Sequence, residues 1–194
     1  MANKPSAILI GDSICMGYRP LVKERLSEKV NILGVSANGG DSSNMLKNLD
    51  EWMISREADL IHFNCGLHDL KLERNATTHQ QPLEAYESNL RKIVERLQKE
   101  TKTPLAWATS TPVIDERHSA VKGFDRHLTD VQAYNKVATA IMTEAGIPID
   151  DLYSVIQNDD VEMCISADGV HMTQRGNSVL TDMVCRFIQD RLGL

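Results

Sequence analysis

The chain has 194 residues, 42% of them hydrophobic, which is the size and composition of one globular domain with a buried core. Its formal charge of -6, from 21 basic and 27 acidic residues, argues against a nucleic-acid-binding protein, because such a protein needs a basic surface to neutralise phosphates. Residues 1–5 lead into an apolar run that ends at Gly11, too short for the core of a signal peptide or for a membrane span. We therefore expect a cytoplasmic protein, unless a leader has been removed from it.

Short apolar runs alternate with segments of helical period along the whole chain. This alternation is typical of an α/β domain with a mostly parallel sheet. Five runs are expected to form strands: residues 7–10, 30–33, 60–63, 105–108 and, with the weakest pattern, 147–149. No repeat, low-complexity tract or linker interrupts them, so the sequence predicts one domain over residues 1–194.

Four segments with apolar side chains at steps of three and four are expected to form helices. These segments contain residues 21–26, 83–97, 131–145 and 179–188. The third has Thr129 or Asp130 as its candidate N-cap, and the last is expected to start near Thr173. Residues 110–129 lack periodicity and follow a strand's carboxyl end, where open α/β sheets place their ligands. This region is either a loop that shapes the substrate site or a solvated connection.

The tripeptide Gly11-Asp12-Ser13 directly follows the first expected strand. These residues are common in turns, so the tripeptide alone is weak. Its position strengthens it, because Ser13 would lie at the carboxyl edge of the sheet beside a helix amino terminus. Backbone N–H groups at such a terminus can face a developing oxyanion.

A second motif, Asp168-x-x-His171, precedes the last expected helix. The three-residue step lets one loop present both side chains to the same cleft, although an Asp that only caps the helix is the alternative. A serine hydroxyl becomes a nucleophile when an imidazole removes its proton and a carboxylate fixes the imidazole tautomer. Ser13, His171 and Asp168 are therefore the candidate nucleophile, base and orienting carboxylate.

Together with two further segments that lie between them, these two motifs resemble the four sequence blocks of the SGNH hydrolase superfamily, also called GDSL esterases and lipases. The four blocks are Gly11-Asp12-Ser13, Asn38-Gly39-Gly40-Asp41-Ser42, Gly66-Leu67-His68-Asp69 and Asp168-Gly169-Val170-His171-Met172-Thr173. The resemblance implies a single-domain three-layer α/β/α sandwich with a mostly parallel, five-stranded, flavodoxin-like sheet. It also implies ester hydrolysis through an acyl-enzyme with no cofactor, Ser13, Asp168 and His171 as catalytic residues, and Ser13 and Gly40 as backbone donors to the oxyanion, with Gly39 as the alternative to Gly40.

The chain departs from the family pattern at His68, which stands where the third block normally has an Asn that donates to the oxyanion. An imidazole also offers an N–H donor. We therefore expect His68 to complete the oxyanion hole, with Asp69 or a backbone carbonyl fixing its tautomer. A structural role for His68 is the alternative.

The remaining histidines are not assigned to a site. His62 falls within an expected strand and is interpreted as a hydrogen-bonded interior group, whereas His79, His118 and His127 are expected to be exposed loop residues. The four cysteines are widely scattered, which favours reduced, structural thiols over a zinc site or a disulfide framework. We expect no metal.

The sequence therefore predicts a serine esterase that acts on a small-molecule ester, with activity that rises with pH as His171 becomes neutral. The few aromatic residues and the lack of an apolar lid favour a short acyl group, such as acetyl on a carbohydrate or other small alcohol. Alternatives are a lysophospholipase or thioesterase of the same superfamily, a flavin-binding protein of the same fold class, and a non-catalytic relative. The sequence predicts no oligomeric state.

Overall fold

The structure is a computed structural model that describes residues 4–194 of the chain. Residues 1–3 of the amino-terminal segment lie outside the described residues. Five parallel strands form the central sheet in the order β2-β1-β3-β5-β7. Their bounds are β1 Ser6–Ile10, β2 Asn31–Leu33, β3 Leu60–Phe63, β5 Leu105–Ala108 and β7 Ile149–Asp150. The prediction of a mostly parallel five-stranded sheet is confirmed.

Two strands begin later than the sequence predicts, because the first residues of each predicted strand belong to the turn that ends the preceding helix. The N–H of Val30 donates to the carbonyl of Leu26, so Val30 closes the turn after the first helix. The N–H of Ile147 donates in the same way to Met142, and β7 therefore starts at Ile149. The side chains of β1 and β3 are almost wholly buried, as expected for parallel strands covered on both faces.

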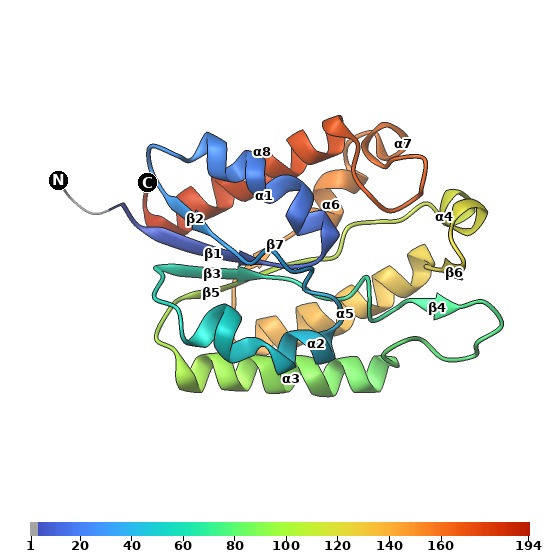
Figure 1. The fold of residues 1–194 in the computed structure, drawn as a ribbon, viewed down its shortest axis with the longest axis horizontal. Coiled ribbons are helices and arrows are strands. Elements are labelled where there is room, and N and C mark those ends of the chain that lie inside the picture. Colours follow the sequence, from blue (N-terminus) through green and yellow to red (C-terminus); the bar gives the residue numbers. More distant parts are fainter. Residues whose placement is uncertain (1–3) are drawn as a thin grey trace.

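Helices cover both faces of the sheet and give the three layers expected from the sequence (Figure 1). One face carries α1 and α8, which pack against each other, and the other face carries α2, α3 and α5. The bounds are α1 Ser13–Arg25, α2 Ser42–Lys47, α3 Leu83–Glu100, α5 Leu128–Glu144 and α8 Gln174–Leu192. Thr173 caps α8 as predicted. The N-cap predicted for α5 at Thr129 or Asp130 is wrong, because the Asp115 carboxylate accepts the N–H of Leu128 and starts the helix earlier.

Several short elements have no counterpart in the sequence analysis. They are α2, the π-helical turn η1 (Asp50–Ile54), α4 (Asp115–Val121), α6 (Leu152–Gln157), α7 (Val161–Cys164), and the antiparallel pair β4 (Leu72–Glu73) and β6 (Phe124–Asp125). The region 110–129 is therefore not an irregular loop, since α4 and β6 lie within it. The β4–β6 pair, called the ribbon below, lies beyond the carboxyl ends of the main strands (Figure 1).

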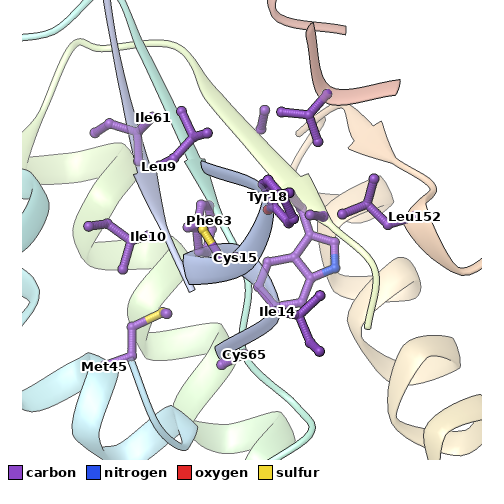
Figure 2. Packing of buried hydrophobic residues seen from close by; sticks show 14 of the residues in the cluster. Leu9, Ile10, Ile14, Cys15, Tyr18, Met45, Ile61, Phe63, Cys65 and Leu152 are labelled. Atoms are coloured by element: carbon purple, nitrogen blue, oxygen red, sulfur yellow. The ribbon is translucent and has the colours of Figure 1, made fainter. Parts of the chain in front are cut away.

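The strand order reverses between β1 and β3, and open α/β sheets bind their ligands at the carboxyl ends of the strands beside such a reversal. The segment that begins at Gly11 leaves β1 there, and the segment that begins at Asn64 leaves β3 beside it. Beneath this point the core is closed by Ile14, Cys15 and Tyr18 of α1, which lie among buried side chains of β1 and β3 (Figure 2). No helix within residues 4–194 is long and apolar enough to span a membrane.

Candidate active site

Ser13 is the first residue of α1 and lies directly past the carboxyl end of β1. The side chain of Asp12 accepts the N–H of Ile14 at 2.9 Å and so caps the helix. Because Ile14 and Cys15 are buried in the core, the helix is anchored there, whereas Ser13 itself remains partly exposed. The local sequence thus places a serine hydroxyl at the carboxyl edge of the sheet.

Ser13, His171 and Asp168 form one hydrogen-bonded chain. The Ser13 Oγ lies 2.9 Å from His171 Nε2, and His171 Nδ1 lies 2.5 Å from Asp168 Oδ2. The other carboxylate oxygen of Asp168 accepts the hydroxyl of Ser166 and the backbone N–H groups of Val170 and His171. Burial opposes its ionisation, but these donors and the imidazole hold the pKa of Asp168 well below its ordinary value. Asp168 is therefore a fixed anion against the imidazole.

The loop that carries Asp168 is held from behind by α4, which the sequence analysis did not predict. Ile114 donates its N–H to the carbonyl of Gly169, and the imidazole Nδ1 of His118 lies 3.2 Å from the carbonyl oxygen of Asp168. Gly169 has φ +76°, and a Cβ there would lie 2.5 Å from backbone atoms of Ile114 and His118. The exposed loop position expected for His118 is wrong: the side chain is buried on α4 against Phe124, and burial lowers its pKa.

The glycine block lies against the start of α1. Gly39 donates its N–H to the carbonyl of Gly11. Among residues 4–194, the one partner of the Gly40 N–H is the side-chain oxygen of Asn38, two residues earlier. Gly40 has φ +65°, a conformation that a residue with a side chain rarely adopts. Asp41 then caps α2 by accepting the N–H of Asn44. Burial raises its pKa, but this bond and those from Gln80, Ser43 and Gln81 hold it at about 2.

His68 lies in the segment after β3 and is partly buried. Burial lowers its pKa, and the charge of Arg126 adds to this effect while the charge of Asp12 opposes it. In its neutral form the imidazole offers one N–H. The tautomer partner expected from the sequence is not present, because both oxygens of Asp69 accept the backbone N–H of Ser42 instead. Within residues 4–194 no hydrogen bond holds the His68 ring. Burial raises the pKa of Asp69 to about 7.

The other histidines are engaged in side-chain pairs. His62 is buried and bonds to Asp150 at 2.9 Å, which confirms the prediction of a hydrogen-bonded interior group. His79 and His127 lie in loops as expected, but each is partly buried and paired with an aspartate. The four cysteines are buried and free. Among residues 4–194 no three metal-ligating side chains gather at one point.

A hydroxyl–imidazole–carboxylate chain at the reversal point of a parallel sheet is the arrangement of a serine hydrolase. The sequence profile of the GDSL-like Lipase/Acylhydrolase family matches residues 9–179. The chain belongs to this family and is a carboxylic ester hydrolase of the SGNH type.

Known relatives match nearly the full length. A GDSL esterase/lipase of Arabidopsis thaliana is 26% identical over 96% of this chain and 86% of its own length. An isoamyl acetate-hydrolyzing esterase 1 homolog of Rattus norvegicus is 25% identical over 91% of this chain and 78% of its own length. The crystal structure of an acetyl xylan esterase superposes with a TM-score of 0.77 at 17% identity, over 94% of this chain and 99% of that one. This last similarity shows the common fold.

Proposed function

We propose that Ser13 is the nucleophile, His171 the general base and Asp168 its orienting partner in ester hydrolysis. The observation that carries the proposal is the continuous chain from Ser13 Oγ through both ring nitrogens of His171 to Asp168. His171 takes the hydroxyl proton while Ser13 attacks the ester carbonyl, and then returns that proton to the leaving alcohol. It next activates water, which releases the acid from the acyl-enzyme. The ionised Asp168 stabilises the imidazolium formed in each half of the reaction.

The oxyanion is held in this proposal by the backbone N–H groups of Ser13 and Gly40 and by the imidazole of His68. Gly40 is favoured over Gly39 because the N–H of Gly39 is already bonded to Gly11. Within the described part of the chain the N–H of Gly40 is bonded to the exposed Asn38 side chain alone, and this side chain can move aside when a substrate oxygen enters. The His68 ring, which has no hydrogen-bond partner among residues 4–194, can turn an N–H toward the same oxygen.

For the substrate we propose a small-molecule ester with a short acyl group, such as acetyl on a carbohydrate or another small alcohol. The names of the rat relative and of the acetyl xylan esterase both refer to acetate esters, and they support this choice. The chain contains only three Phe, two Trp and four Tyr with which to line a long acyl tunnel. We also propose a cytoplasmic location, which the four free cysteines support.

The test is a series of p-nitrophenyl esters from acetyl to dodecanoyl, followed by acetylated sugars. The expected result is the highest kcat/KM at two to four acyl carbons, with turnover abolished in Ser13→Ala and the serine labelled by a fluorophosphonate only in the wild type. A maximum at eight carbons or more, or preference for acyl-thioesters or lysophospholipids, would replace the proposed substrate with the thioesterase or lysophospholipase alternative. Activity that survives Ser13→Ala would refute the proposed nucleophile.

A further inference from the structure

Arg126 is a buried cation that the mechanism above does not use. It follows β6 of the ribbon, and 6% of its surface is exposed. Its Nε donates to the carbonyl of Leu67 at 2.5 Å, so the guanidinium is attached to the peptide segment that carries His68. We propose that Arg126 binds a carboxylate of the ester substrate, so that the preferred substrate is an ester bearing a carboxyl group. This inference rests on the proposed function, since it requires the ester to lie at Ser13.

The guanidinium has no carboxylate partner of its own. Within residues 4–194 no Asp or Glu oxygen forms an ion pair with Arg126, and its two Nη groups make no hydrogen bond. Arg19 of α1 is partly buried and differs from Arg126, because both its Nη groups donate to carbonyl oxygens. Burying a cation without an anion is unfavourable, and burial lowers the pKa of Arg126. Among the described residues the Nη atoms have no hydrogen bond and are not among the fully buried atoms without a partner, so their four N–H donors reach solvent and are available to a ligand.

The groups around Arg126 belong to the candidate active site. The nearby charges of Asp12 and Asp168 act on its pKa, and its own charge lowers the pKa of His68. The carbonyl that the guanidinium binds belongs to Leu67, which directly precedes His68, so Arg126 lies beside the segment that carries the third proposed oxyanion donor. Its Cζ lies 4.9 Å from the centre of the Phe124 ring. The proposal requires a substrate bound at Ser13 to extend as far as this cation.

The charge balance favours a carboxylate over a dianionic phosphate. Lys71 shares the Phe124 ring at 4.4 Å but is paired with Glu73, and the nearest lysine to the triad, Lys122, faces Asp168. Arg126 is then the one cation near the site that lacks a carboxylate in the described part of the chain. Its two Nη groups form a planar fork that matches the two oxygens of a single carboxylate.

A structural role for Arg126 is the alternative to substrate binding. Asp12 is buried, and its Oδ2 has no hydrogen-bond partner among the described residues. Arg126 could serve only as a counter-charge to Asp12 while it anchors Leu67. In that case its removal lowers the turnover of all esters by the same factor. The test must therefore compare two esters within each variant.

Two matched substrate pairs distinguish a substrate-binding role of Arg126 from a structural one. One pair has the carboxylate on the acyl side of the ester and the other has it on the alcohol side. For the acyl side the pair is mono-p-nitrophenyl glutarate and p-nitrophenyl pentanoate, and for the alcohol side it is 4-acetoxybenzoate and methyl 4-acetoxybenzoate. The expected result is that the wild type prefers the carboxylate ester in at least one pair. Arg126→Gln should lower that kcat/KM ratio by about tenfold to a hundredfold, the usual effect of losing a hydrogen bond to a charged group. Arg74→Gln is the matched control, because it removes an exposed cation beside the same ribbon and should leave the ratio unchanged.

The results that contradict the role of Arg126 differ from the result that contradicts the proposed function. Equal losses on both members of a pair in Arg126→Gln, or no preference for a carboxylate in the wild type, would overturn the proposed role of Arg126. If the wild type hydrolyses none of the four esters, the proposed function itself fails. Should Arg126→Gln not fold, Arg126→Lys keeps the charge but lacks the planar fork. Its ratio should fall several-fold, and an unchanged ratio would overturn the proposal.

Discussion

Gly39 donates its backbone N–H to the carbonyl oxygen of Gly11 at 2.9 Å, and a Cβ on Gly39 would lie only 2.7 Å from that oxygen. The loop that carries Gly40 can therefore approach the turn before Ser13 only because residue 39 has no side chain. This contact fixes the distance between two of the proposed oxyanion donors.

Gly39→Ala is expected to move the glycine loop away from Ser13, to lower kcat at least tenfold and to destabilise the protein by about 2 kcal/mol or more. Gly40→Ala should cost less stability, about 1 kcal/mol, since its added Cβ meets mainly the flexible side chain of Asn44 and the cost comes from the positive φ. Denaturant unfolding and ester turnover of both variants measure the difference. A larger loss of stability in Gly40→Ala would contradict this account.

Asp168→Asn is expected to lower kcat by about a thousandfold or more, because an amide cannot hold His171 in the tautomer that accepts the serine proton. The KM should change little. Asp159→Asn is the control, since Asp159 is another aspartate near α7 whose partner is the exposed Arg175. Kinetics on p-nitrophenyl acetate compare the two. Equal activity of both variants would exclude Asp168 from the mechanism.

His68→Ala is expected to lower kcat about a hundredfold, the usual effect of removing an oxyanion donor. His68→Asn should restore most of the activity, because an amide also donates an N–H. The His68 ring makes no hydrogen bond within the described chain, so a loss of activity in His68→Ala would not come from the loss of a structural hydrogen bond. Nearly full turnover in the alanine variant would mean that His68 has no part in holding the oxyanion.

The buried Asp69 predicts a pH-dependent stability. Its pKa is raised to about 7 in the folded protein and lies near 4 in the unfolded chain, so the folded state binds the proton more tightly. Its contribution to stability is present below about pH 4 and is lost as the pH rises to about 7. The difference in unfolding free energy between the wild type and Asp69→Asn should fall over this range, by up to about 4 kcal/mol.

Unfolding at pH 5 and pH 8 measures this difference. The variant keeps an oxygen that can accept the N–H of Ser42 but does not titrate, so it serves as the reference. A difference that stays constant between the two pH values would show that Asp69 titrates normally.

The sequence predicts the elements that bury long apolar patterns. The β3 strand and the start of α8 agree with expectation because each combines continuous or periodic apolar residues with a clear boundary, such as Thr173. The ribbon was missed because its strands have two residues each, too few to show a period. His118 was placed wrongly for a related reason: its burial depends on Phe124 and on the Asp168 carbonyl, contacts that no local pattern reveals.

At the candidate site, too, some features follow from local sequence patterns and others depend on tertiary packing. The positions of Ser13 and His171 follow from motifs at element boundaries, whereas the choice of Ser42 over His68 as the partner of Asp69 depends on how two distant loops pack. Arg126 carries no motif at all. An unpaired cation is recognisable only when its burial and the lack of an anion can be observed together.

Ser13 and His171, which lie 2.9 Å apart, are separated by 158 positions in the sequence. A chain emerging from the ribosome therefore presents Ser13 long before the proposed base His171 has been synthesised, and the sheet alone is not an enzyme. Esterase activity should appear only when the last segment has left the exit tunnel and α8 has docked on α1. The nascent protein is therefore expected to have no esterase activity until its synthesis is nearly complete.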